Sequence, residues 1–145
     1  MKAFSFWDRW LLAVSLLLTL FGLALAFLNQ TPLFDALFNN RINPVFWPST
    51  EVTQEIATFQ QWAYGVLGAT VAGWGIVVAF VARYPFLKRE RWAWNALAVG
   101  ITLWFIIDTS LSLYFKAVFN AAFNTLVFFL VWIPLLFTRK EFRSA

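Results

Sequence analysis

The side chains able to do chemistry in this chain gather in one short region of the sequence. Asp108 is an acidic residue inside a long apolar stretch, and Thr109 and Ser112 follow it on the same side of a predicted helix. Asn120 and Asn124 lie four residues apart in the next apolar stretch, so they also share a helix face. Carboxylate, amide and hydroxyl groups of this kind form hydrogen bonds, or hold a cation through their oxygen atoms.

The composition excludes several kinds of active site. The 145 residues include no His and no Cys. Zinc sites made from imidazole and thiolate, His-ligated haem, thiol nucleophiles and Ser-His-Asp triads are therefore excluded. Because no pairing of a nucleophile with a base and no metal cluster is visible either, we expect a protein that is not an enzyme. The sequence identifies no cofactor.

Four apolar stretches must position the polar residues. They cover residues 10–28, 62–82, 92–115 and 117–138. Each is long enough for a helix that crosses a hydrocarbon core of roughly 30 Å, which needs about 20 residues. The whole chain is 61% hydrophobic and 12% charged, whereas soluble domains are roughly 25% charged. The predicted fold class is therefore all-α, a polytopic membrane protein whose single domain, residues 1–145, is a four-transmembrane-helix bundle.

The basic residues predict how the chain is oriented. Nine of its eleven Lys and Arg residues lie in the N-terminal segment, the connection 83–91 and the C-terminal tail. Because Lys and Arg are retained on the cytoplasmic side, we expect both termini to be cytoplasmic in a bacterial-type inner membrane. The basic start and Ala24-Leu25-Ala26 also resemble a signal peptide, but the first apolar run is longer than the usual core of about 7–15 residues.

The connection of residues 29–61 is the one substantial segment outside the four spans. Its stretch Leu33–Phe38 is amphipathic and is predicted to lie flat at the membrane surface as a helix of about two turns. Ser49 or Thr50, followed by Glu51, is typical of a helix N-terminus. The second helix is therefore predicted to start near residue 50 and to project beyond the bilayer.

The third and fourth spans are joined by a tight turn at residues 114–117, so they must be antiparallel neighbours. With a rise of 1.5 Å per residue, Asp108 falls between Asn120 and Asn124 in depth. We expect Asp108 to contact one or both amides inside the bundle, because an intramembrane carboxylate costs about 2.5–3.5 kcal/mol on insertion scales and needs partners. The complete predicted cluster is Asp108, Thr109, Ser112, Asn120, Asn124 and Gln61.

Small residues spaced by four predict where the second span packs against another helix. Gly65, Ala69 and Gly73 form the face expected to approach a neighbouring backbone closely, and Gly68 and Ala72 lie on the adjoining face. Packing within the bundle is the favoured interpretation. Homodimerisation through the same small-residue face is the alternative.

The sequence is compatible with three roles for the polar cluster. It can be a structural knot, in which hydrogen bonds to Asp108 fix the helix register, an oxygen-ligand site for a cation or polar head group, or a site with a proton-coupling carboxylate. We expect a non-catalytic integral membrane protein, either an accessory or assembly subunit or a small binding bundle organised around Asp108. The alternative is a small carboxylate-dependent transporter or channel, alone or as an oligomer. The expected partners are the lipid bilayer and a protein partner or second copy, whereas the dispersed basic residues argue against nucleic acid.

Overall fold

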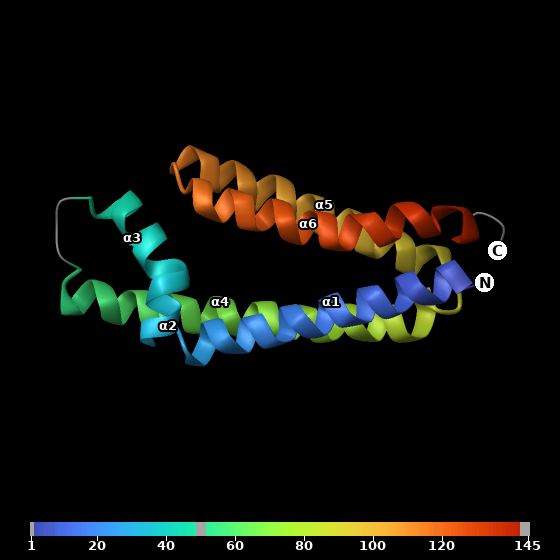
Figure 1. The fold of residues 1–145 in the computed structure, drawn as a ribbon, viewed down its shortest axis with the longest axis horizontal. Coiled ribbons are helices and arrows are strands. Elements are labelled where there is room, and N and C mark those ends of the chain that lie inside the picture. Colours follow the sequence, from blue (N-terminus) through green and yellow to red (C-terminus); the bar gives the residue numbers. More distant parts are fainter. Residues whose placement is uncertain (1, 49–51, 143–145) are drawn as a thin grey trace.

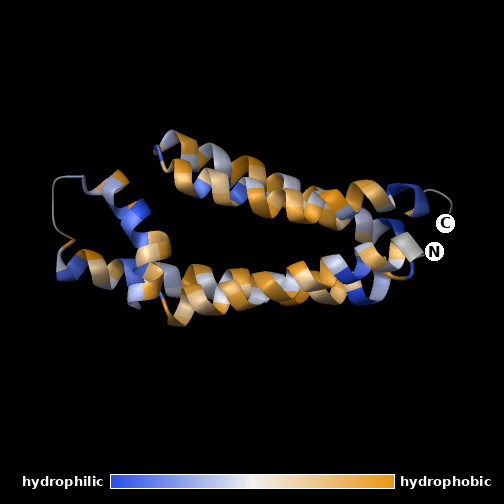
Figure 2. Cartoon of the chain, in the orientation of Figure 1, coloured by the Kyte–Doolittle hydropathy of each residue, from blue (hydrophilic) through white to orange (hydrophobic). Residues whose placement is uncertain are grey.

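The structure is a computed structural model that describes residues 2–48 and 52–142, and this part of the chain contains helices and turns but no strand. Its long helices are α1 (Lys2–Phe27), α4 (Gln54–Val81), α5 (Arg91–Tyr114) and α6 (Val118–Thr138). All four are long and apolar enough to cross a membrane. Apolar residues follow their whole length, and hydrophilic residues gather toward the ends of the molecule (Figure 2). The predicted all-α class and the four long apolar helices are confirmed.

The long helices form two antiparallel pairs (Figure 1). α1 packs against α4, and α5 packs against α6 as their tight connection predicts. Contacts between α1 and α6 join the two pairs. The backbones of α4 and α5, which are both fully described, do not approach each other as closely as the backbones within each pair do. The helices are therefore arranged in the order α4, α1, α6, α5, and backbone packing leaves the bundle open between α4 and α5.

The N-terminal segment, the α4–α5 connection and the C-terminal segment meet at one end of the bundle (Figure 1). The connection is the π-helical turn η2 (Ala82–Phe86), and α6 is followed by the 3-10 turn η3 (Arg139–Phe142). Phe4, Phe86 and Phe142 are buried there with ring centroids 4.7–6.0 Å apart. The three segments that carry most of the basic residues are thus held together at a common end.

Small residues let α1 and α4 approach closely. A Cβ atom added to Gly68 would lie 2.5 Å from the carbonyl oxygen of Gly22 and 2.5 Å from the amide nitrogen of Ala26. Gly75 meets α1 in the same way, where its added Cβ would lie 2.7 Å from the amide nitrogen of Thr19. At these positions the space between the two helices accommodates the hydrogen atom of a glycine but not the methyl group of an alanine.

The prediction that Gly65, Ala69 and Gly73 form this close-packed face is wrong. A Cβ atom added to Gly65 or Gly73 has no neighbour within 4 Å, and Ala69 is exposed. The packed face is the adjoining one, with Gly68 and Ala72. It faces α1 because the small residues of α1 complement it, so the choice between two small-residue faces depends on the partner helix.

The connection between α1 and α4 is a helical segment that lies between the two helix pairs (Figure 1). It consists of α2 (Pro32–Phe34), the π-helical turn η1 (Asp35–Asn39) and α3 (Asn40–Phe46). Thr31 caps its start, since the Thr31 hydroxyl accepts a hydrogen bond from the Phe34 amide at 3.3 Å. The predicted amphipathic stretch is therefore helical, but it is longer than two turns and its Phe34 side chain is buried within the protein.

The predicted helix start at Ser49, Thr50 and Glu51 lies outside the described residues. α4 itself begins at Gln54, since Val52 and Thr53 are described and are not helical. Its cap is Thr53, whose hydroxyl accepts a hydrogen bond from the Ile56 amide at 3.4 Å. With 28 residues, α4 is about 42 Å long at 1.5 Å per residue. This length exceeds the roughly 30 Å hydrocarbon core, as expected for a helix that projects beyond it.

Candidate functional site

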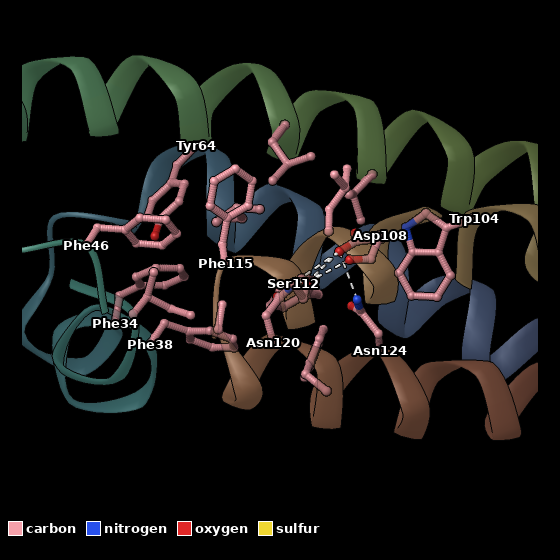
Figure 3. A pocket seen from close by; sticks show the side chains of 18 residues that line it. Phe34, Phe38, Phe46, Tyr64, Trp104, Asp108, Ser112, Phe115, Asn120 and Asn124 are labelled. Carbon is pink, nitrogen blue, oxygen red and sulfur yellow. Dashed lines mark hydrogen bonds between the residues drawn. The ribbon is translucent and has the colours of Figure 1, made fainter. Parts of the chain in front are cut away.

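Asp108 lies at the centre of a hydrogen-bonded cluster formed by α5 and α6 (Figure 3). Its Oδ1 atom accepts hydrogen bonds from Asn120 Nδ2 at 3.0 Å and from Asn124 Nδ2 at 2.8 Å. The Ser112 hydroxyl donates to the Asp108 carbonyl oxygen at 2.7 Å and lies 3.2 Å from the same carboxylate oxygen. The predicted contact between Asp108 and both amides is therefore present in the structure.

The turn between α5 and α6 explains why these side chains meet. The Ala117 amide donates to the Ser112 carbonyl oxygen at 2.7 Å, and the Lys116 amide donates to the Leu113 carbonyl oxygen at 3.0 Å. This pair of hydrogen bonds is a Schellman motif with Lys116 in the left-handed conformation, at φ 61°. The chain reverses within a few residues, which brings the first turns of α6 alongside the last turns of α5.

Two other predicted members of the cluster have different outcomes. Thr109 lies at its edge, with its hydroxyl oxygen 3.5 Å from Asn124 Nδ2. Gln61 is exposed and contacts none of the cluster residues, so its predicted position above Asp108 is wrong. Successive residues of a helix are rotated by 100° around its axis, so the side chain of Gln61 points away from the bundle although that of the preceding residue, Gln60, points into it.

Gln60 is the buried glutamine of α4, and the sequence interpretation missed it. Its Nε2 atom donates to Asn43 Oδ1 at 2.7 Å and to the Tyr64 hydroxyl at 3.2 Å. A signal for it exists in the sequence, because Gln60, Tyr64, Gly68 and Ala72 are spaced by four and share the face that packs inward.

A cavity of about 340 Å³ lies between the two helix pairs, and the Asp108 cluster forms part of its wall. The other lining residues are mainly apolar and include six Phe, one Tyr and one Trp. Figure 3 labels Phe34, Phe38, Phe46, Tyr64, Trp104 and Phe115 around this space. The cavity thus combines an extended aromatic surface with a single compact group of polar side chains.

The α2–α3 segment covers one end of the cavity through aromatic contacts with both helix pairs. The Phe38 ring centroid lies 5.6 Å from that of Phe21 on α1 and 5.8 Å from that of Phe123 on α6. The Phe46 ring centroid lies 6.1 Å from that of Phe115, the residue directly after α5. Because these rings come from elements on both sides, the segment fixes the separation between the pairs at this end.

The carboxylate of Asp108 is satisfied on one oxygen only. All hydrogen bonds to it reach Oδ1, and Oδ2 has no hydrogen-bond partner among the described residues. The lining of the cavity includes no Lys or Arg side chain. Asp108 therefore presents one unpaired oxygen, without a cationic partner in the cavity wall.

The chemistry of this cavity is that of recognition through charge, hydrogen bonds and aromatic surface. Asp108 and Tyr64 are the titratable side chains that line it, and the remaining polar groups are amides and a hydroxyl. No family model, curated protein or solved structure matches the chain, so the geometry of the site is the basis for its interpretation.

Proposed function

We propose that this protein is a non-catalytic membrane protein that binds a small lipophilic molecule in the cavity between its two helix pairs. The observation that carries the proposal is the unpaired Asp108 oxygen in the wall of an aromatic cavity. Small-molecule sites are typically concave and mostly apolar with a few placed polar groups, and they measure about 300–1,000 Å³. The cavity volume of about 340 Å³ is at the lower end of this range.

A binding role accounts for two features that a purely structural knot does not need. A knot requires only that the carboxylate be satisfied by neighbouring donors, and the donors of Asn120 and Asn124 already satisfy Oδ1. The second oxygen and the space beside it serve no purpose in such a knot. A bound ligand fills the space and gives the second oxygen a partner.

The proposal includes the placement of the protein in a bacterial-type inner membrane, with four crossings and both termini in the cytoplasm. The support is the common end at which the basic N-terminal, η2 and C-terminal segments meet. The side between α4 and α5 then faces lipid. Leu67 on α4 and Leu111 on α5 line the cavity and are 51% and 53% exposed, so a ligand dissolved in the bilayer reaches the cavity between these helices.

Thermal unfolding of the purified protein in a mild detergent tests this function with two aromatic probes of equal shape. Benzyltrimethylammonium is a permanent cation, and neopentylbenzene is its uncharged carbon isostere. We expect at least one probe to raise the Tm in a concentration-dependent manner, because a ligand of the folded state stabilises it by mass action. If neither probe changes the Tm of the wild-type protein, the proposed function is refuted.

A pair of variants shows whether a probe binds in this cavity. Val71 lines the cavity, and Val71→Trp would fill part of it. Val77 lies on the same helix, is 58% exposed and does not line the cavity, so Val77→Trp is the matched control. The shift in Tm should disappear in Val71→Trp and persist in Val77→Trp. Equal shifts in both variants would show that the probe binds elsewhere.

A further inference from the structure

We infer that the ligand of this cavity is a lipophilic organic cation, an amphiphile whose ammonium or related cationic head contacts Asp108 while its apolar body lies among the aromatic rings. This inference rests on the proposed binding function and specifies the class of ligand. Three properties of the cavity favour such a ligand: the hydrogen-bonding capacity left in the polar cluster, the balance of charge, and the chemistry of the wall.

The amide groups of the polar cluster have used their hydrogen atoms and kept their oxygen atoms. The amide of Asn120 donates to Asp108 Oδ1 and to the Ser112 hydroxyl, at 3.0 and 2.8 Å. The amide of Asn124 donates to Asp108 Oδ1 and to the Thr109 hydroxyl, at 2.8 and 3.5 Å. Each amide nitrogen carries two hydrogen atoms, so both are engaged in each residue.

What remains for a ligand is a set of oxygen atoms. The Ser112 hydroxyl hydrogen is directed to the Asp108 carbonyl oxygen at 2.7 Å. Within the described chain, no hydrogen bond reaches Asp108 Oδ2 or the side-chain carbonyl oxygens of Asn120 and Asn124. Beside Asp108 Oδ2, a ligand group must therefore donate hydrogen bonds or carry positive charge, since neither amide nor Ser112 has a hydrogen atom left to donate to a carboxylate or phosphate.

The balance of charge favours a cation over an uncharged donor. Charged side chains within a membrane are costly and usually pair with an opposite charge. The cavity lining contains the Asp108 carboxylate and no Lys or Arg, so the protein itself does not supply that opposite charge there. A cationic ligand supplies it.

The wall of the cavity favours an organic cation over a metal ion. Calcium takes 6–8 oxygen ligands and magnesium demands an octahedral set, whereas the cluster has three unpaired side-chain oxygens, Asp108 Oδ2 and the carbonyl oxygens of Asn120 and Asn124, with a single carboxylate among them. Most of the lining is aromatic and aliphatic, and the faces of Phe, Tyr and Trp attract cations within about 6 Å of the ring centroid. A quaternary or protonated ammonium group on an apolar body matches both parts of the wall, the carboxylate and the rings.

Comparing the two probes in the wild-type protein tests the inference directly. Benzyltrimethylammonium should bind at least about tenfold more tightly than neopentylbenzene, a preference equivalent to about 1.4 kcal/mol. Affinities are measured by titration calorimetry at equal detergent concentration. Equal affinities, or tighter binding of the uncharged probe, would overturn the cationic class while leaving the binding function in place. Absence of binding by both probes would instead refute the function itself.

Removing the charge of Asp108 provides the second test. Asp108→Asn keeps the shape of the side chain and should lose the preference for the cationic probe. Glu55→Gln removes a charge from an exposed position of α4 outside the cavity and should keep that preference. A preference that survives in Asp108→Asn would contradict the inference. If Asp108→Asn fails to fold, the comparison of the two probes in the wild-type protein still decides.

An ammonium head can belong to a free amphiphilic amine or to the head group of a zwitterionic lipid. Nanodiscs made of phosphatidylglycerol, with and without phosphatidylethanolamine, distinguish these sources. If the lipid head group is the natural occupant, phosphatidylethanolamine should weaken the apparent affinity for benzyltrimethylammonium. If a free amine is the occupant, the affinity should stay the same. The comparison of the two probes decides whether the head is cationic, and this competition assigns its source.

Discussion

Replacing Gly68 with Ala should push α1 away from α4 and destabilise the protein. The added Cβ atom would lie 2.5 Å from the Gly22 carbonyl oxygen, 2.5 Å from the Ala26 amide nitrogen and 2.9 Å from the Ala26 Cα. All three neighbours are backbone atoms, so no side-chain rotation can relieve the overlap. The two helices must separate to make room for the methyl group.

The size of the effect follows from this separation. Carbon atoms in contact normally lie about 3.5–4.0 Å apart, so the helices must move by about 1 Å near Gly68. Overpacking of this kind costs about 1–3 kcal/mol, and a gap of 0.5–1 Å forfeits roughly a quarter to a half of the dispersion energy of neighbouring contacts. The better helix propensity of Ala returns about 1 kcal/mol. We expect a net loss of up to about 2 kcal/mol in the free energy of unfolding.

The assay is reversible unfolding in mixed micelles of increasing SDS content, followed by Trp fluorescence. Gly65→Ala is the matched control, since it makes the same change on the same helix at a position with no neighbouring atom within 4 Å. The control should be neutral or should stabilise the protein by up to about 1 kcal/mol through helix propensity. If the two variants have equal stability, the close packing of α1 against α4 at Gly68 is not the reason for the glycine there.

Three further predictions concern the polar cluster, the α5–α6 turn and the membrane topology. Asp108→Leu should lower the free energy of unfolding by about 1–3 kcal/mol, because it leaves the buried amide of Asn124 and the half-buried amide of Asn120 without their acceptor. Asp108→Asn should lower it less in the same SDS titration, and equal losses would contradict the role of these hydrogen bonds. Lys116→Gly should raise the free energy of unfolding by up to about 1 kcal/mol. The left-handed conformation at φ 61° costs a residue with a Cβ atom about 1–2 kcal/mol, and the larger entropy that Gly loses on folding offsets part of this gain. A less stable variant would show that the Lys side chain contributes more to stability than the backbone conformation costs. Cysteines introduced at Asn40 and Lys140 should react with an impermeant maleimide from opposite sides of the membrane, and labelling of both from one side would disprove the proposed topology.

Much of the candidate site could be predicted because it depends on local geometry. The length of each apolar stretch predicts a long helix, and the tight turn at residues 114–117 makes α5 and α6 neighbours whatever the rest of the chain does. With the rise per residue known, the depths of Asp108, Asn120 and Asn124 follow, and their contact is present in the structure. Few alternative arrangements exist for side chains on two helices that share one short connection.

The face by which α4 packs was decided only by the tertiary structure. Gly65, Ala69 and Gly73 repeat with the same spacing as Gly68 and Ala72, so the sequence of α4 alone offers two equivalent small-residue faces. Gln61 shares the exposed face with Gly65 and Ala69 by the same spacing, whereas the buried Gln60 shares the packed face. The choice depends on how the small residues of α1 meet α4, and α1 is separated from α4 by more than twenty residues of chain.

The cavity likewise exists only in the tertiary structure. It requires that α4 and α5 stay apart while α1 and α6 join the two pairs, and that Phe38 and Phe46 of the connecting segment pack against rings on both sides. Helix formation, depth and the contacts across a tight turn depend on neighbouring residues, so the sequence by itself determined them. The orientation of whole helix faces and the space left between them depend on complementary surfaces from distant segments, so they were decided when those segments packed together.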